Sequence, residues 1–189
     1  IYTLTATAVD NLGASGTSSS RTVTVSNAGA ASQTLLTTQV PAATFTDGVP
    51  YELGIRVMPD VAGQFTAVRF WKAASEAPGT HVGHVWSSSG QLLATVTFVN
   101  ETASGWQQQN LTTALPVIGN TEYVVSVNTA NYFVDTQNAF VTSFVNGHLR
   151  APAGANGVFA APATFPTGSY ASSNYFRDVV FSTGAALPD

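Results

Sequence analysis

The fold class of this chain is decided by residues 65–109, FTAVRFWKAASEAPGTHVGHVWSSSGQLLATVTFVNETASGWQQQ. Side chains alternate with period two over residues 66–71 and again over residues 92–99, which is the pattern of strands with one face in a core. The Ser87–Gly90 stretch ends in a glycine, which can take the positive φ of a hairpin turn. We therefore predict a meander of antiparallel strands, against which the rest of the chain packs.

The composition is that of a folded domain and excludes several classes of function. Of the 189 residues, 44% are hydrophobic, 11% are aromatic and only 8% are charged, with a net charge of −4. A disordered chain would be richer in charge and poorer in aromatic residues. The six lysine and arginine residues form no patch that could follow a phosphate backbone, so we expect no nucleic-acid partner. No apolar run approaches the ~20 residues of a membrane span, so we also expect no membrane-spanning segment.

The residue types also bear on the compartment. The chain has no cysteine, so its fold depends on a core, with or without a bound metal, and not on disulfides. A single lysine, Lys72, and abundant Thr, Ser, Ala, Asn and Gly are typical of the surface and secreted proteins of bacteria. We therefore expect a secreted or cell-surface, extracellular location.

Residues 1–25 predict a β-hairpin, and residues 26–34 predict a small, polar linker. The pattern TATAVDNLGASGTSSSRTVTVS, from Thr5 to Ser26, resembles the last two strands of the immunoglobulin-like repeats of bacterial surface proteins. A lone hairpin is marginally stable and exposes two unpaired edges. We therefore expect it to dock on the following module, to pair with another chain, or to belong to a repeat whose other strands precede it.

Residues 35–183 predict one all-β module, followed by a short tail at residues 184–189. Tyr51–Met58 alternates as a half-buried strand, and Tyr175–Phe181 alternates as the last strand. No stretch shows a helical period. The segment Asn128–Tyr170 is irregular and rich in Gly, Pro and Ala, as functional or surface loops are. We predict an antiparallel, jelly-roll-like β-sandwich of about eight to ten strands.

Five motifs cover nearly all of residues 50–182. They are, in chain order, YELGIRV (51–57), VAGQFTAVRFWK (61–72), GTHVGHVWSSSGQLLATVTFVNETASGWQ (79–107), NTEYVVSV (120–127) and FPTGSYASSNYFRDVVF (165–181). Together they resemble a bacterial family, the domain of unknown function 4082. Trp71 replaces a commoner tyrosine and Phe176 a commoner tryptophan, and both exchanges keep an aromatic ring. The resemblance implies an extracellular β-sandwich that occurs beside immunoglobulin-like, cadherin-like and sometimes glycoside-hydrolase domains, and these companions suggest carbohydrate or matrix binding.

The histidines and carboxylates suggest structural roles. His81 and His84 are three residues apart in an extended segment, so their side chains leave opposite faces and do not suit one metal ion. We expect His81 to make a structural hydrogen bond. Glu52 and Asp178 lie near the ends of the first and last strands of the module, which often pair in such sandwiches. Three roles fit them: ion pairs with arginines, ligands of a structural calcium ion, or a catalytic acid pair. The low charge of the chain favours ion pairs over calcium, and calcium over catalysis.

Motifs for enzymatic chemistry are missing from the sequence. It has no Gly-x-Ser-x-Gly elbow, no cysteine nucleophile, no phosphate-binding glycine loop and no HExxH zinc motif. We therefore expect no enzymatic activity.

Aromatic side chains close to polar ones carry a binding hypothesis. Exposed rings stack on the C–H faces of sugars by the forces that stack them on other rings and cations, and nearby polar groups bond the hydroxyls. The predicted ligand-binding residues are Trp71, Tyr132, Asp135, Asn138, His148, Arg150 and Tyr170. The alternative is that these rings only cover the end of the sandwich.

Two functions therefore fit the sequence. The first is a non-catalytic, extracellular binding module of a larger secreted protein, with a polysaccharide or cell-surface glycan as its partner. The second is a structural or adhesive subunit, in which the hairpin of residues 1–25 adds strands to a neighbouring copy of the chain. A binding module should be a monomer retained on polysaccharide, whereas a fibre subunit should assemble and bury residues 1–25 between chains.

Overall fold

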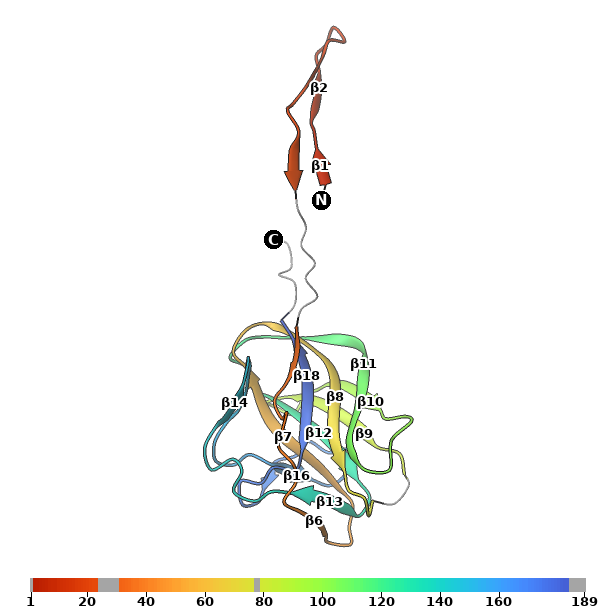
Figure 1. Cartoon of the computed structure of the whole chain (residues 1–189), viewed down its shortest axis with the longest axis vertical. Helices are drawn as coiled ribbons and strands as arrows, with labels where there is room; N and C mark the ends of the chain where they lie inside the picture. The colour runs from red at the N-terminus through yellow and green to blue at the C-terminus, as the bar shows by residue number, and fades with distance from the viewer. Residues whose placement is uncertain (1, 24–30, 77–78, 184–189) are drawn as a thin grey trace. The chain divides into compact units, whose positions relative to one another are not determined.

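The computed structural model describes residues 2–23, 31–76 and 79–183 (Figure 1). The chain divides into one unit of residues 1–30 and a second unit of residues 31–189, each with its own sheets. No helix in the described ranges is long and apolar enough to cross a membrane.

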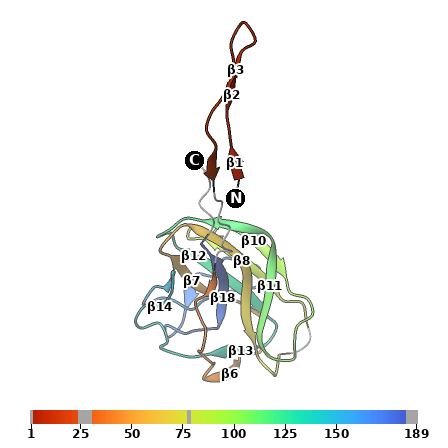
Figure 2. The ribbon, with the colours of Figure 1, turned by 45° about the horizontal axis from the view of Figure 1, so that its top comes forward.

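The first unit is one long hairpin, drawn in red in Figures 1 and 2. Its strands are β1 (Tyr2–Leu4), β2 (Thr7–Val9), β3 (Ser15–Thr17) and β4 (Arg21–Val23), with β1 paired to β4 and β2 to β3. At its turn, Asp10 Oδ1 accepts hydrogen bonds of 2.9 Å from the backbone N–H groups of Leu12 and Ala14. Every residue from 2 to 23 is exposed, so this part of the predicted hairpin buries no core of its own. Its kinship to immunoglobulin-like repeats stays a prediction.

The second unit is an antiparallel β-sandwich, which confirms the predicted fold class. The larger sheet has the order β10 (Leu92–Thr97), β9 (Val82–Ser87), β12 (Tyr123–Thr129), β7 (Tyr51–Pro59), β15 (Leu149–Ala151) and β14 (Phe144–Asn146), with β16 (Val158–Ala160) also on β7 and β17 (Gly168–Ser169) on β16. The smaller sheet has the order β11 (Gly105–Val117), β8 (Gly63–Lys72), β18 (Arg177–Ser182) and β5 (Ser32–Thr34). A ribbon of two short strands, β6 (Ala43–Thr46) and β13 (Tyr132–Asp135), lies at one end of the sandwich (Figures 1 and 2).

The stretch that predicted the fold forms β8, β9, β10 and the start of β11. In the β9–β10 hairpin Leu92 pairs with Trp86, and Gly90 takes a φ of 88° in the turn. A Cβ on Gly90 would also stand 2.9 Å from the ring of Phe165. The turn therefore needs glycine both for its backbone and for space.

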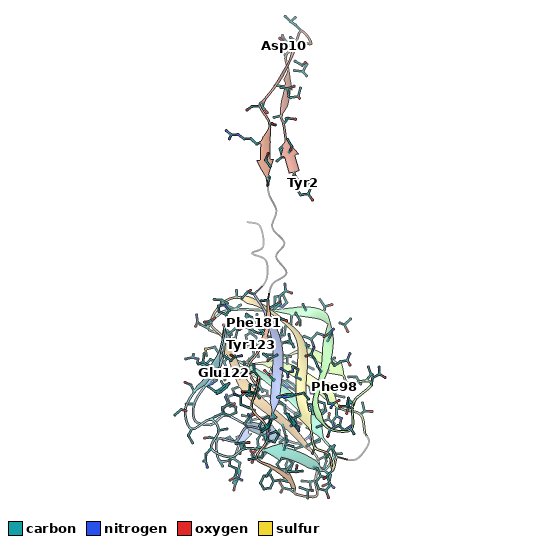
Figure 3. The ribbon with its side chains drawn as sticks, viewed as in Figure 1. Tyr2, Asp10, Phe98, Glu122, Tyr123 and Phe181 are labelled. Atoms are coloured by element: carbon teal, nitrogen blue, oxygen red, sulfur yellow. The ribbon has the colours of Figure 1, made fainter. Side chains whose placement is uncertain are left out.

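The main core lies between the two sheets. Phe65 of β8 contacts Tyr123 at 5.5 Å and Phe181 at 6.1 Å between ring centroids, both edge-on, and the last two are labelled in Figure 3. All three rings are buried. Burial of each large apolar side chain contributes about 1.5–3 kcal/mol, so residues from β8, β12 and β18 hold the sheets together.

Two predictions about strands are corrected by the structure. The described part of the second unit has fourteen strands, β5 to β18, instead of about eight to ten. The segment Asn128–Tyr170, predicted to be irregular, contributes five short strands of two to four residues. Strands this short show too few alternations to be read from sequence.

Strand β7 was predicted to be half-buried, and it is buried on both faces. The reason is a segment from much later in the chain. The side chain of Asn156 accepts a hydrogen bond from the backbone N–H of Arg56 (2.9 Å) and donates one to its carbonyl oxygen (3.0 Å). Phe165 then packs 5.8 Å from Trp86. The outer face of the larger sheet is therefore covered by its own loop.

The predicted linker of residues 26–34 ends earlier than predicted. Ser32–Thr34 form β5, in which Gln33 pairs with Phe181 of β18. The Gln33 side chain also accepts a hydrogen bond of 2.9 Å from the backbone N–H of His148. Residues 24–30 of the predicted hairpin and linker, and the tail of residues 184–189, lie outside the described residues.

Candidate binding site

The β6–β13 ribbon forms one wall of the candidate site. Each strand carries a phenylalanine that is followed two residues later by an aspartate, at residues 45–47 and 133–135. Phe45 lies directly opposite Phe133 in the ladder. Because side chains alternate between the two faces of a strand, Phe133 shares a face with Asp135. Asp47 follows the last residue of β6 and lines the same pocket as Phe45. Val134 points to the other face and is buried in a separate apolar cluster. The ribbon therefore presents two rings and two carboxylates to one side.

That side of the ribbon faces a pocket of about 400 Å³. The lining comprises six aromatic side chains, two carboxylates, a leucine and a glutamine, namely Phe45, Asp47, Tyr51, Leu53, Phe133, Asp135, Gln137, Phe159, Tyr170 and Tyr175. None of these described residues is a lysine, an arginine or a histidine. The pocket is therefore apolar and carries negative charge only.

The rings of the pocket contact one another in a continuous chain. Phe133 lies 6.1 Å from Phe45, 6.1 Å from Tyr51 and 6.0 Å from Tyr175, between ring centroids. Tyr51 in turn lies 6.0 Å from Phe159. The first of these pairs is stacked and the others are edge-on, as aromatic pairs prefer. These contacts hold the rings in place before any ligand arrives.

Asp135 is the buried carboxylate of the pocket, with 3% of its surface exposed. The hydroxyl of Ser173 donates to Oδ2 at 3.1 Å, whereas Oδ1 has no hydrogen-bond partner within the described part of the chain. Burial raises the pKa of Asp135 above its ordinary value, although the Ser173 hydroxyl and the nearby backbone N–H of Thr136 act to lower it. Burial, helped by the Asp135 carboxylate, also raises the pKa of Tyr175 to about 12. Oδ1 of Asp135 therefore lacks the donor or cation that usually accompanies a buried carboxylate oxygen.

Asp47 is the exposed carboxylate of the pocket. The Tyr51 hydroxyl donates to Asp47 Oδ2 at 3.0 Å. Desolvation and the neighbouring Asp47 carboxylate raise the pKa of Tyr51, so its hydroxyl keeps the proton that it donates. Behind Asp47 the chain turns at Gly48, which has a φ of 73° and donates its N–H to Thr46 Oγ1 at 3.2 Å. The turn thus sets where the exposed carboxylate stands.

Glu76 fixes the corner from which β13 starts. Its Oε1 accepts hydrogen bonds from Thr129 Oγ1 (2.9 Å) and the Ala130 N–H (2.7 Å), and its Oε2 accepts one from the Tyr132 N–H (2.9 Å). Burial alone would raise the pKa of Glu76, but its hydrogen bonds with His81 and with these three groups lower it. A charged carboxylate therefore anchors the strand that carries Asp135.

Arg177 adjoins the pocket but is not among its lining residues. Its guanidinium donates to the backbone carbonyl oxygens of Tyr175 and Val127. Burial lowers the pKa of Arg177 to about 10, against the carboxylates of Glu52 and Glu76, which raise it. Two of its nitrogens therefore bond the protein's own backbone, whereas its Nε has no partner among the described residues.

The predicted ligand-binding residues lie in three places and not in one. Asp135 and Tyr170 line the aromatic pocket. Asn138 lies near Tyr170: its backbone N–H donates a hydrogen bond of 2.8 Å to the carbonyl oxygen of Ala171, the next residue in the chain. Three of the seven predicted residues thus belong to this region.

Trp71 and Tyr132 belong to a different region. Trp71 lines a hollow of about 350 Å³ whose other lining residues are mostly small, such as Ala73 and Gly105. Tyr132 and Trp71 both pack against the cluster that contains Val134. Tyr132 lies on the Val134 face of the β6–β13 ribbon, which explains why the same strand supplies Asp135 to one site and Tyr132 to another.

His148 and Arg150 line a third hollow of about 200 Å³. His148 Nδ1 lies 2.7 Å from Asp60 Oδ1. The β14–β15 hairpin pairs with the end of β7, where Arg150 faces Met58, whereas the aromatic pocket lies at Tyr51, where β7 begins. Seven residues of strand separate these points by about 23 Å, so the structure does not bring His148 and Arg150 together with Asp135 and Tyr170.

Glu52, one of the two predicted calcium ligands, is buried in the larger sheet. Its Oε1 lies 3.0 Å from His84 Nδ1, and its Oε2 accepts a hydrogen bond of 3.1 Å from the Ala163 N–H. It therefore holds the covering loop to the outer face of β7.

Asp178, the other predicted ligand, lies in the smaller sheet. It accepts hydrogen bonds of 3.0 Å from the backbone N–H groups of Leu35 and Leu36, and it pairs with Arg69 at 3.3 Å. The expected ion pair with an arginine is thus confirmed for Asp178. The structure does not bring Glu52 and Asp178 together, and the described ranges hold no group of three or more His, Cys, Asp or Glu suited to a metal ion. Structural calcium stays a prediction.

The expected structural role of His81 is confirmed. Its Nδ1 lies 2.8 Å from Glu101 Oε1, and its Nε2 lies 3.5 Å from Glu76 Oε1. Glu101 also pairs with Lys72 at 2.9 Å. The His81 ring therefore lies between the carboxylates of Glu76 and Glu101 and contacts both.

Sequence reasoning missed most of the pocket: Phe45, Asp47, Tyr51, Phe133, Phe159 and Tyr175. A usable signal was present, because the Phe-x-Asp pattern occurs three times in a chain with few acids, at residues 45–47, 133–135 and 176–178. The first two copies are far apart in sequence, and only the pairing of Phe45 with Phe133 in the ribbon shows that they share a site.

The comparisons with known proteins agree with this architecture. Residues 37–177 match the family described as a domain of unknown function, DUF4082. No curated protein matches the chain. The matched range contains every residue that lines the aromatic pocket. Since the match covers well over half of the chain, as the motifs of the module indicated, this protein belongs to the DUF4082 family.

Proposed function

We propose that the aromatic pocket binds one or a few units of a polysaccharide or cell-surface glycan, and that the chain is a non-catalytic, extracellular binding module. The observation that carries this proposal is the lining of six aromatic side chains around about 400 Å³, a volume within the ~300–1,000 Å³ of small-molecule pockets. The rings offer flat apolar faces to the C–H groups of a sugar. The two carboxylates and Gln137 offer hydrogen-bond acceptors to its hydroxyl groups.

Binding is favoured over hydrolysis because the sequence carries none of the motifs of enzymatic chemistry considered above. Sparse lysine and the resemblance to extracellular modules support the location.

A glycan array with the whole chain, with and without calcium, tests the proposal. Tyr170 is 60% exposed at the pocket, and its replacement by alanine should weaken the best ligand about tenfold, or about 1.4 kcal/mol. Tyr2, 64% exposed in the hairpin, is the matched control, and Tyr2→Ala should bind as the unchanged chain does. Failure to retain any polysaccharide, or equal affinities for the two variants, would contradict the proposal.

A second candidate, strand pairing between copies of the chain, is favoured by the hairpin. Its apolar side chains are exposed, Val9 by 65% and Leu4 by 58%. Exposed strand edges recruit further strands, and an edge lysine blocks this pairing. If the hairpin assembles, Val9→Lys should reduce the sedimentation coefficient of the chain, whereas Val145→Lys, at an exposed position of the module, should not. A monomer at every concentration would exclude this candidate.

A further inference from the structure

The aromatic pocket carries negatively charged groups, which the binding of a neutral sugar does not require. Two of its ten lining residues are carboxylates, Asp47 and Asp135, and the lining drawn from the described chain contains no basic side chain. A pocket with one sign of charge and apolar walls concentrates the field on its ligand. The lining therefore favours a ligand of positive charge.

Asp135 supplies the specific contact. Its Oδ2 is bonded to Ser173, and its Oδ1 is without a partner among the described residues although the side chain is only 3% exposed. A buried carboxylate oxygen is stabilised most by a charged donor, because charge-assisted hydrogen bonds are the strong ones. A hydroxyl group would satisfy Oδ1 more weakly than an ammonium group would.

No lysine, arginine or histidine side chain in the described ranges bonds this oxygen. Arg177, which adjoins Tyr175, donates to the carbonyl oxygens of Tyr175 and Val127 and is not among the lining residues. A metal ion is disfavoured, because no set of three metal-binding side chains occurs in the described residues. The missing partner is therefore an organic cation.

The rings suit the same ligand. Asp135 shares a strand face with Phe133, which contacts Tyr51 and Tyr175. An ammonium group within ~6 Å of ring centroids is attracted by their π faces, most strongly where water is excluded. The apolar side of a sugar ring can meet the more exposed Phe45 and Tyr170 at the same time.

From this arrangement we propose that the saccharide unit bound in the pocket is an amino sugar with a free, protonated amine, whose ammonium group donates to Asp135 Oδ1. The inference rests on the proposed function and narrows its ligand to polymers with unacetylated amino sugars. N-Acetylation removes the charge and adds bulk beside Asp135, and a uronic acid brings a carboxylate toward two others. The expected order of affinity is amino sugar, then N-acetylated sugar, then uronic acid.

Isothermal titration of the whole chain tests this order near neutral pH. The probes are hexamers of glucosamine, of N-acetylglucosamine and of galacturonic acid, together with a hexalysine peptide. We expect the glucosamine hexamer to bind at least ten times more tightly than the N-acetylated hexamer.

Asp135→Asn, which keeps an acceptor for Ser173, should remove this preference. Asp10→Asn, at the exposed hairpin turn, should leave it unchanged. Phe133→Leu, which removes the ring that shares a strand face with Asp135, provides a second variant if Asp135→Asn does not fold, and it should also reduce the preference.

The outcomes separate the inference from the proposed function. Equal binding of the glucosamine and N-acetylglucosamine hexamers, or a preference that persists in Asp135→Asn, overturns the inference and leaves saccharide binding in place. Tighter binding of hexalysine than of the glucosamine hexamer overturns the assignment to a sugar. Failure of all three saccharides to bind overturns the proposed function and the inference with it.

Discussion

Asp178 and Glu76 are both buried carboxylates, yet the protein shifts their pKa values in opposite directions. Burial raises the pKa of Asp178 to about 6, although backbone N–H groups and Arg69 lower it in part. Burial also acts to raise the pKa of Glu76, but there its hydrogen bonds outweigh it. Solvation and hydrogen bonding thus compete at each site, and burial wins only at Asp178.

Asp178 should make the stability of the module depend on pH. Its pKa is about 6 in the folded chain and 3.8 ordinarily, so the folded state favours the protonated form. The stabilisation is complete below pH 3.8 and is lost as the pH rises through about 6. The shift corresponds to roughly 3 kcal/mol in the free energy of unfolding. Urea unfolding measured below pH 3.8 and above pH 6 should show that the free energy of unfolding falls more for the unchanged chain than for Asp178→Asn. If the two proteins have parallel pH profiles, the effect is excluded.

Gly157 and Gly154 should differ sharply in their tolerance of a methyl group. Both have positive φ, 71° and 92°, but a Cβ on Gly157 would stand 1.8 Å from the carbonyl oxygen of Ser173, and one on Gly154 would meet nothing within 4 Å. Gly154→Ala should cost about 1–2 kcal/mol of backbone strain. Gly157→Ala should cost at least ~2 kcal/mol more, because the backbone of the opposite segment must move. Chemical denaturation measures both, and equal costs would refute the steric argument.

At the scale of elements, the sequence predicted what local alternation controls. The runs at residues 66–71 and 92–99 became β8 and β10, and the glycine turn closed the β9–β10 hairpin. The second buried face of β7 was missed because its cover, near Asn156, comes from a distant part of the chain. The pocket was missed for the same reason: Asp135 was predicted, but the strand opposite it was not.

The corner before β13 should be a sensitive point of the module. Glu76→Ala removes three hydrogen bonds to residues 129–132 and leaves buried donors unsatisfied, which should cost about 2–4 kcal/mol. It should also weaken ligand binding, since β13 carries Asp135. The matched control is Glu122→Ala, whose ion pair with Arg56 at 3.0 Å is partly exposed and contributes at most about 1 kcal/mol. Thermal unfolding compares the two, and equal losses would contradict the anchoring role of Glu76.

At the scale of the whole molecule, the two units differ in how they are stabilised. The module has a core that joins both sheets, whereas the described residues of the hairpin are all exposed. The free energy of unfolding of the module should therefore depend on its own core and not on the hairpin.

Two substitutions test this difference. Phe181→Ala, at a fully buried ring of β18, should lower the free energy of unfolding by about 3–5 kcal/mol. Leu12→Ala, at a side chain that is 89% exposed in the hairpin, should leave the midpoint of thermal unfolding unchanged. A drop in the midpoint for Leu12→Ala would show that the hairpin contributes to the stability of the fold.

The pairing of β5 with β18 has a mechanical consequence. Ser32 faces Ser182 in this ladder, so the polypeptide enters and leaves the sandwich at adjacent points. The β6–β13 ribbon lies toward the other end (Figures 1 and 2), and Tyr175 of the pocket precedes β18 by two residues. Tension between a tethered polymer and the chain would therefore run lengthwise along β18. Its hydrogen bonds to β8 would share that load together, in shear, instead of opening one after another.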